Sequence, residues 1–313
     1  MRVLLAGATG ALGRRLLPML VEAGYEVTGT TTSTQKVAVI EATGARAAVM
    51  NGLDRESVLE AMDAARPDVV VHQLTALAGR GNLRKFDKEF TTTNRLRTIG
   101  TDHLLAAAHE VGAKRLVAQS FTGWTNARTG GKVKDETDPL DPHPPAGARE
   151  TLAAIEYVEK EVPSAGGLDG LVLRYGGFYG PGTGLGAGGD LLGMVRTRRL
   201  PLVGDGAGVW SLVHIDDAAR ATVCAVEHGG PGLYNIVDDE PAPMSQWLPY
   251  LAAAVGAKPP LRLPVWLARP LVGEHGISLT TQIRGSSNAK ARRELGWELR
   301  YPTWREGFRT ALG

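Results

Sequence analysis

Three glycines, Gly7, Gly10 and Gly13, follow the first aliphatic run of the chain at a spacing of three residues. Residues 3–6 have the composition of a short buried strand, and an apolar pattern with helical spacing begins at the end of the glycine stretch. In this setting the first glycine permits the tight turn, the second lets the backbone approach a pyrophosphate, and the third allows close helix packing. The helix N-terminus adds free N–H groups and a positive dipole end. We therefore expect a dinucleotide to be bound here, by Gly7, Thr9, Gly10, Leu12 and Gly13.

The end of the second predicted strand, residues 26–30, indicates which dinucleotide the turn prefers. An Asp or Glu at this point would hold the ribose hydroxyls of NAD, but residues 29–33 read Gly-Thr-Thr-Thr-Ser and contain no acid. Hydroxyl side chains with a nearby cation, Arg14 or Lys36, suit a 2′-phosphate better. We therefore expect NADP in preference to NAD, with Thr31, Thr32, Ser33 and Lys36 at its phosphate. The alternative is that the hydroxyl residues only cap the next helix.

The other chemistry-bearing residues form no second motif. The seven histidines (72, 103, 109, 143, 214, 228 and 275) have no spacing typical of metal ligands, so the sequence predicts no metal site. No G-x-S-x-G segment marks a nucleophilic serine. The glycine-rich stretch 182–189 lacks the G-K-[ST] ending of a P-loop, and we expect it to form a flap over the substrate cleft or an inert connection.

Alternating strand and helix patterns surround the glycine turn. Short aliphatic runs predict strands at 3–6, 26–30, 46–50, 68–72, 114–120 and 171–174. Helical patterns lie between them, including a long helix over 90–111 and another helix over 149–162. Continuous apolar strands that alternate with helices predict a parallel sheet covered on both faces. We expect an α/β protein with a Rossmann-like, doubly wound parallel sheet.

The regular alternation fades after Tyr175. Residues 176–189 are rich in glycine, and the stretches 241–249 and 259–270 are rich in proline. We therefore expect residues 1–175 to form the dinucleotide-binding domain, with 205–236 returning to it. Residues 176–204 and 237–313 are expected to form a smaller substrate-binding region.

Composition excludes several classes of protein. The 313 residues carry 35 Lys and Arg against 33 Asp and Glu, a balance that excludes a protein coating nucleic acid. No run approaches the about 18–20 apolar residues of a membrane span. The single cysteine, Cys224, excludes an intramolecular disulfide framework and indicates a reducing compartment. We expect a cytoplasmic protein that acts on a small molecule, without a nucleic-acid or membrane partner.

Further motifs occur in order along the chain. They lie at residues 70–76, at Thr93-Asn94 with Gly100-Thr101, and at 116–120, 173–182, 213–219 and 288–297. Together with the glycine turn, they resemble the extended short-chain dehydrogenases/reductases, the group that contains NDP-sugar epimerases and dehydratases, over nearly the whole chain. The resemblance implies that Leu74 and Thr75 lie in the cofactor loop and that Ser120 is the catalytic hydroxyl. It also implies a homodimer formed through the helices 90–111 and 149–162.

The family's Tyr-x-x-x-Lys pair is missing. In the family, the tyrosine exchanges a proton with the substrate oxygen, and the lysine lowers its pKa and holds the nicotinamide ribose. Counting from Ser120 at the family's spacing reaches Pro145 and Arg149. Proline supplies no proton, and arginine does not titrate near neutral pH, although Arg149 can still bind ribose hydroxyls. The standard acid/base pair is therefore absent.

Other residues are candidates for the missing proton donor. Ser120 is placed to orient a carbonyl by hydrogen bonding. Tyr175 and Tyr179 flank the glycine pair that opens toward the nicotinamide, and either phenol could replace the missing tyrosine; packing is the alternative role of Tyr179. His143 lies in a loop expected to border the site and titrates in the right range.

The substrate contacts of the family are also altered. Gly177 stands where the family keeps an asparagine, and Trp210 stands where an arginine commonly grips the diphosphate. Replacing a charged arginine by the indole of Trp210 disfavours an NDP-sugar as the substrate. It favours a less anionic, aromatic or apolar substrate. Trp124 is expected to form a wall of the same pocket, beside His143, Gly177 and Trp210.

These observations favour an atypical NADP-dependent oxidoreductase that reduces or oxidises a small carbonyl or alcohol substrate. Ser120 would orient the oxygen, and an unidentified group or water would handle the proton. One alternative is an epimerase or dehydratase that uses transient oxidation by bound NADP. Another is a non-catalytic, NADP-binding redox-sensing regulator, which the Pro145 and Arg149 replacements favour.

Overall fold

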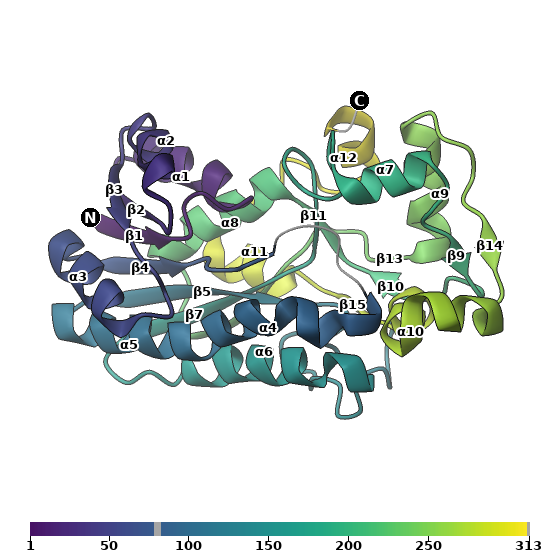
Figure 1. The fold of residues 1–313 in the computed structure, drawn as a ribbon, viewed down its shortest axis with the longest axis horizontal. Coiled ribbons are helices and arrows are strands. Elements are labelled where there is room, and N and C mark those ends of the chain that lie inside the picture. Colours follow the sequence, from purple (N-terminus) through teal and green to yellow (C-terminus); the bar gives the residue numbers. More distant parts are fainter. Residues whose placement is uncertain (78–82, 312–313) are drawn as a thin grey trace.

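The computed structural model describes residues 1–77 and 83–311. Its centre is a seven-stranded sheet with the order β12-β7-β5-β4-β1-β2-β3, in which all neighbours are parallel (Figure 1). The order reverses between β1 and β4, where a crevice forms outside the carboxyl ends of the strands. The predicted Rossmann-like, doubly wound fold is confirmed. The strands are β1 (Arg2–Ala6), β2 (Glu26–Thr31), β3 (Arg46–Val49), β4 (Val69–His72), β5 (Arg115–Phe121), β7 (Asp169–Tyr175) and β12 (Gly232–Ile236).

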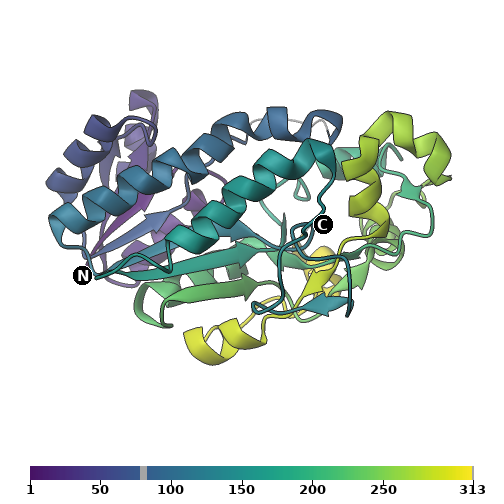
Figure 2. The ribbon, with the colours of Figure 1, turned by 90° about the horizontal axis from the view of Figure 1, so that it is seen from below.

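Helices cover both faces of this sheet because alternate strand residues are apolar on both sides. Val3 and Leu5 point into a core shared with α1 (Gly13–Glu22), α8 (Ile215–Glu227) and α11 (Ala289–Leu295). Leu4 and Ala6 point into the opposite core, which receives side chains of α3, α4, α5 and α6. Figure 2 shows α4 and α5 end to end along this second face, with α6 running beside them. These helices span α3 (Arg55–Ala65), α4 (Phe86–Arg97), α5 (Ile99–Val111) and α6 (Arg149–Glu161).

The long helix predicted over 90–111 is broken into two. α4 ends at Arg97 and α5 begins at Ile99, with Thr98 between them at φ −94° and ψ −81°. The Thr98 hydroxyl donates to the carbonyl of Asn94 at 3.1 Å, a side-chain bond that competes with the regular helix ladder. The break makes Arg97 the last residue of α4.

The C-terminal part of the chain packs at the carboxyl edge of the sheet (Figure 1). Its own core is aromatic and contains Tyr179, Trp247, Trp304 and Phe308. Its helices are α7 (Asp190–Arg196), α9 (Met244–Ala254), α10 (Val265–Thr281) and α12 (Trp304–Ala311). Four short strand pairs tie it together: β8 (Gly177–Tyr179) with β11 (Leu212–His214), β9 (Leu202–Val203) with β14 (Arg262–Leu263), β10 (Val209–Trp210) with β13 (Ala242–Pro243), and β6 (Val133–Lys134) with β15 (Gly285–Ser286).

The remaining helical elements are short connections. They are α2 (Val37–Glu41) and the 3₁₀ turns Thr34–Lys36, Leu83–Lys85 and Ala146–Ala148. Within residues 1–77 and 83–311, no helix combines the length and the apolar character that crossing a bilayer requires.

Candidate active site

The glycine turn joins β1 to α1 and leaves no room for side chains at two of its glycines. Gly7 has φ +94°, and a Cβ there would lie 2.7 Å from the carbonyl oxygen of Gln73. A Cβ on Gly13 would overlap the carbonyl oxygen of Gly7. The backbone N–H groups of Thr9, Ala11 and Leu12 have no hydrogen-bond partner among the described residues. These free donors at a helix N-terminus fit a pyrophosphate.

The end of β2 lies beside this turn and carries hydroxyl groups. Thr30 Oγ1 accepts a hydrogen bond from the N–H of Gly7 at 3.3 Å. The Thr31 hydroxyl lies 3.4 Å from that of Thr9 and accepts from the N–H of Ser33 at 3.2 Å, so Thr31 is buried and holds the turn. Lys36 and Thr32 are exposed. Both side chains therefore lie at the surface just after β2.

An aromatic cavity of about 270 Å³ lies at the carboxyl ends of β5 and β7, against the C-terminal region. Its volume is at the small end of the usual range for ligand pockets. Three of the four predicted pocket residues, Trp124, Gly177 and Trp210, line it, together with the predicted Thr75, Ser120 and Tyr175. The lining is dominated by rings, namely Phe86, Phe90, Phe121, Trp124, Phe178, Trp210 and His275.

Ser120 lies in the cavity wall, but its hydroxyl proton is engaged. Its Oγ donates to Glu159 Oε1 at 2.7 Å. The same carboxylate forms a buried, bidentate ion pair with Arg174, with Nε–Oε1 at 2.8 Å and Nη2–Oε2 at 2.5 Å. Such fork geometry is strong and directional. Ser120 can therefore accept a hydrogen bond from a substrate, whereas donating one requires it to leave Glu159.

The two tyrosine candidates have different positions. Tyr175 lines the cavity, but its hydroxyl lies 2.7 Å from the Thr222 hydroxyl and accepts from Gln73 Nε2 at 3.1 Å. Burial raises the pKa of this phenol above its ordinary value. Tyr179 is fully buried between His214 and Phe308 and does not line the cavity. The prediction of Tyr179 as a catalytic phenol is therefore wrong, because it packs in the C-terminal core.

Two predicted residues at and before the start of α6 lie away from this cavity. Arg149 and His143 are exposed and do not line it, and the role of Arg149 at the cofactor ribose stays a prediction. The residues of α6 that face the cavity are Thr151 and Ile155, four positions apart. Neither is a tyrosine or a lysine, so the Tyr-x-x-x-Lys pair is missing at these two positions as well. The loop between β5 and α6 contains β6 and a bridge between Asn126 and Leu140.

The structure also brings in residues that the sequence did not single out. His275 lies against the rings of Phe86 and Trp124, with centroid distances of 4.2 and 5.1 Å. Neither of its ring nitrogens has a hydrogen-bond partner among the described residues, and burial lowers its pKa to about 4. Arg97 is 7% exposed and also lines the cavity. Arg97 falls between Asn94 and Gly100, two residues of a family-like motif, but no part of that motif marks Arg97 itself.

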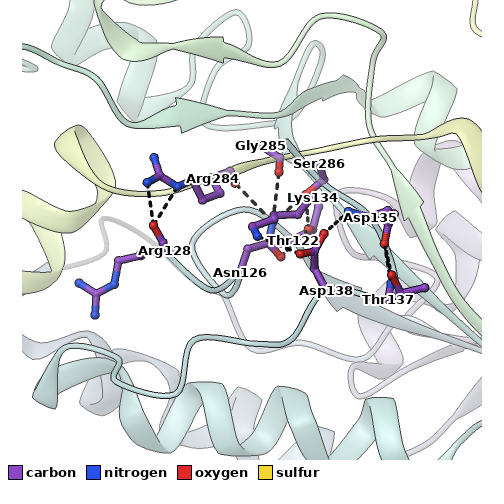
Figure 3. A network of polar contacts seen from close by, with 10 residues as sticks. All are labelled: Thr122, Asn126, Arg128, Lys134, Asp135, Thr137, Asp138, Arg284, Gly285 and Ser286. Carbon is purple, nitrogen blue, oxygen red and sulfur yellow. Dashed lines mark hydrogen bonds and ion pairs between the residues drawn. The ribbon is translucent and has the colours of Figure 1, made fainter. Parts of the chain in front are cut away.

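A polar network fixes the wall that carries Trp124 (Figure 3). The Thr122 and Ser286 hydroxyls lie 2.6 Å apart, and Asn126 Nδ2 donates to Ser286 Oγ at 2.9 Å. Arg284 Nη2 donates to the carbonyl of Arg128 at 2.7 Å. The backbone on both sides of Trp124 is therefore tied to the C-terminal segment, and its indole packs edge-on against His275.

Among the described residues, no group of three or more His, Cys, Asp or Glu side chains is arranged to hold a metal ion. The site therefore consists of a phosphate-binding turn and an aromatic cavity at one edge of the sheet.

Comparisons with known proteins agree with this geometry. A model of the NAD dependent epimerase/dehydratase family matches residues 3–236. The 3-diazoavenalumate denitrifying reductase of a Streptomyces species is 45% identical over 311 residues, which cover 98% of this chain and 99% of the relative. The 2-alkyl-3-oxoalkanoate reductase of Stenotrophomonas maltophilia is 30% identical over 277 residues, which cover 82% of this chain and 76% of the relative.

A solved structure extends the similarity over the whole fold. The UDP-glucose 4-epimerase of Thermus thermophilus, in complex with NAD, has a TM-score of 0.75 and 25% sequence identity, covering 99% of this chain and 97% of that chain. The glycine turn, the parallel sheet and the extent of these matches agree, and the chain is an enzyme of the NAD-dependent epimerase/dehydratase family.

Proposed function

We propose that the protein is an NADP-dependent reductase that transfers hydride to a planar aromatic substrate and supplies no proton of its own. The observation that carries this proposal is an aromatic cavity at the carboxyl ends of β5 and β7 whose described lining holds no available acid. The reduced nicotinamide would supply the hydride. The cavity walls would hold the substrate ring by stacking and exclude water.

The titratable groups of the cavity are poor proton donors at neutral pH. Among the described lining residues they are Arg97, Tyr175 and His275. Arginine retains its proton, and burial raises the pKa of the Tyr175 phenol, which is also engaged with Gln73 and Thr222. The pKa of His275 is lowered to about 4, so its ring is neutral at pH 7. Reduction of a ketone needs a proton for the alkoxide that forms, and none of these three groups is a good donor of that proton.

An arenediazonium group needs no such proton. Hydride adds to its terminal nitrogen to give an aryl diazene, which loses N₂ while the transferred hydrogen ends on the ring carbon. Arenediazonium and reduced nicotinamide thus give arene, N₂ and oxidised nicotinamide, with charge and atoms balanced. The relative that shares 45% identity is named a denitrifying reductase of a diazo compound, which supports this substrate class.

The choice of NADP rests on the residues after β2. No carboxylate follows Thr31, and the exposed Thr32 and Lys36 suit a 2′-phosphate. Binding titrations with NADPH and with NADH test this choice. A dissociation constant for NADH that is equal to or lower than that for NADPH would overturn it.

The reaction is tested with 3-diazo-4-hydroxycinnamate and with NADPH deuterated at C4. We expect NADPH-dependent release of N₂ and one deuterium on ring carbon 3 of the product, when the transferred position carries the label. A panel of aryl ketones serves as the comparison. Faster turnover of the ketones than of the diazo compound would contradict the proposal. Tight NADPH binding with no turnover of either would instead favour a redox-sensing regulator.

A second candidate is reduction of a carbonyl, as the name of the 30% identical oxoalkanoate reductase suggests. The observation in its favour is His275, whose two ring nitrogens have no partner in the described part of the chain and border the cavity. Turnover of ketones that is lost in His275→Phe would support this reading.

We also propose a homodimer, which would pair helices α4, α5 and α6 of two copies, and a cytoplasmic location. Sedimentation equilibrium across a range of concentrations tests the dimer, and a constant monomer mass would exclude it.

A further inference from the structure

Two arginines are buried on either side of one carboxylate. Arg174 is 3% exposed and Arg97 is 7% exposed. Glu159 pairs with Arg174 through both of its oxygens and also accepts from Ser120. Arg97 forms no ion pair with any described carboxylate, and Glu159 reaches it only through longer-range attraction. Glu159 is therefore engaged by Arg174, and Arg97 is left without a close anion.

The positive charge of Arg97 has almost no nearby partner to offset its burial. Its Nη1 donates to Asn94 Oδ1 at 3.3 Å, its Nε has no partner among the described residues, and its guanidinium carbon lies 5.8 Å from the Phe90 ring centre. A buried cation without a close anion is costly, and proteins normally pair it. Burial lowers the pKa of Arg97 to about 10, so the group is still charged at neutral pH.

The neighbouring titratable groups do not supply the missing anion. His72 and His275 have pKa values lowered to about 4 by burial and are neutral at pH 7. Asp87 caps α6: it accepts from the N–H groups of Glu150 and Thr151 and from the Thr151 hydroxyl. Arg97 is thus the one described lining residue of the cavity that carries a charge at neutral pH.

We propose that Arg97 binds a carboxylate of the substrate, so that the cavity takes a planar aromatic carboxylate. This inference rests on the proposed function, because it names the substrate class of that same site. The ring would lie among Phe86, Phe90 and Trp124, and the carboxylate would occupy the donor positions of the guanidinium. A guanidinium fork matches a carboxylate in shape and charge. The anion would complete the charge balance that Glu159 leaves open.

The test compares an acid with its neutral ester in the absence of turnover. The wild-type protein is saturated with NADP⁺ and titrated with 4-hydroxycinnamate or with its methyl ester by calorimetry. We expect the acid to bind about 100-fold more tightly than the ester, because the ester cannot form the charge-assisted pair. A wild-type preference near unity overturns the inference without any variant.

Substitutions of Arg97 test whether this residue causes the preference for the acid over the ester. In Arg97→Gln we expect the acid-over-ester preference to fall about 100-fold, and in Arg97→Lys to fall by a smaller factor, since the charge remains but the fork is lost. The control is Arg95→Gln, an exposed arginine on the same helix, which should keep the wild-type preference. An unchanged preference in Arg97→Gln or Arg97→Lys refutes the assignment. If Arg97→Gln does not fold, the Arg97→Lys variant and the acid-against-ester comparison in the wild-type protein still test the assignment.

The outcomes separate the two proposals. A preference for the acid that depends on Arg97, together with no release of N₂ from the diazo probe, keeps the carboxylate site and rejects the reductase reaction. Release of N₂ without any acid preference keeps the reaction and rejects the carboxylate site.

Discussion

The glycine turn takes its structure from residues 7–13, whereas the aromatic cavity draws its lining from segments between Thr75 and Ile283. In the turn, the backbone itself excludes side chains and presents N–H groups. In the cavity, side chains from α4, α6 and α10 meet the ends of β5 and β7. A phosphate site of this kind depends on local geometry, while the substrate site depends on how distant elements pack. The two regions should therefore respond differently to single substitutions.

The largest effect is expected for the buried ion pair behind the cavity. Glu159→Gln removes the carboxylate that pairs with Arg174 and turns one of its two acceptor oxygens into an amide donor, so the bidentate pair is lost. Breaking a buried pair on one side costs about 3–5 kcal/mol of unfolding free energy. Urea denaturation measures this loss, with the exposed Glu156→Gln on the same helix as the control. A loss below about 1 kcal/mol would mean that the pair does not hold the cavity together.

The turn itself should be the next most sensitive point. In Gly13→Ala the new Cβ overlaps the carbonyl oxygen of Gly7, so the start of α1 must move away from the phosphate site. We expect NADPH to bind about 100-fold more weakly, equivalent to about 2.7 kcal/mol. Gly166→Ala, where a Cβ meets nothing within 4 Å, is the matched control. Unchanged affinity in Gly13→Ala would show that the turn does not carry the phosphates.

Burial of His275 predicts that this one cavity residue makes the unfolding free energy depend on pH. Its pKa is lowered to about 4 from the ordinary value of 6.5, so between these values the unfolded chain binds the proton and the folded chain does not. The stabilisation is therefore fully present above pH 6.5 and is lost as the pH falls toward 4. In His275→Phe we expect the slope of unfolding free energy in this window to fall by up to about 1.4 kcal/mol per pH unit.

His72 and His214 also have pKa values lowered to about 4, and their contributions to the slope should be unchanged in the variant. Urea titrations at several pH values measure it. An unchanged slope in His275→Phe would mean that the ring is solvated in solution.

Removing the cation beyond β2 should affect cofactor selectivity modestly. Lys36 is exposed, so Lys36→Ala is expected to weaken NADPH about tenfold, or about 1.4 kcal/mol, and to leave NADH nearly unchanged. Parallel titrations with both cofactors measure the ratio. Equal losses for the two cofactors would argue against a 2′-phosphate contact.

The smallest effect is expected at Arg149. Because this residue is exposed and does not line the cavity, Arg149→Ala should change NADPH affinity and turnover by less than about twofold. A large loss would restore the family-spacing assignment of this position to the cofactor.

The fold and the glycine turn could be predicted from the sequence because their signals are local. Strand runs, helical spacing and the three glycines each act over a few neighbouring residues. The cavity could be predicted only where a family motif marks it, as at Trp124, Gly177 and Trp210. His275 lies on α10 in a segment without a motif, and it reaches the cavity only through tertiary packing. The assignment of Arg149 depends on counting along a loop whose length and internal bridge the sequence does not reveal.

The contact between Thr122 and Ser286 joins positions 164 residues apart, and His275, Leu279 and Ile283 of the cavity come from the same late segment. During synthesis, the glycine turn and most of the sheet leave the ribosome long before these residues do. The same late segment also supplies α11, whose Ala291 and Leu295 pack in the core with Leu5 and Leu16. Folding of the cavity wall and of the layer under the glycine turn must therefore wait until the end of the chain has been made.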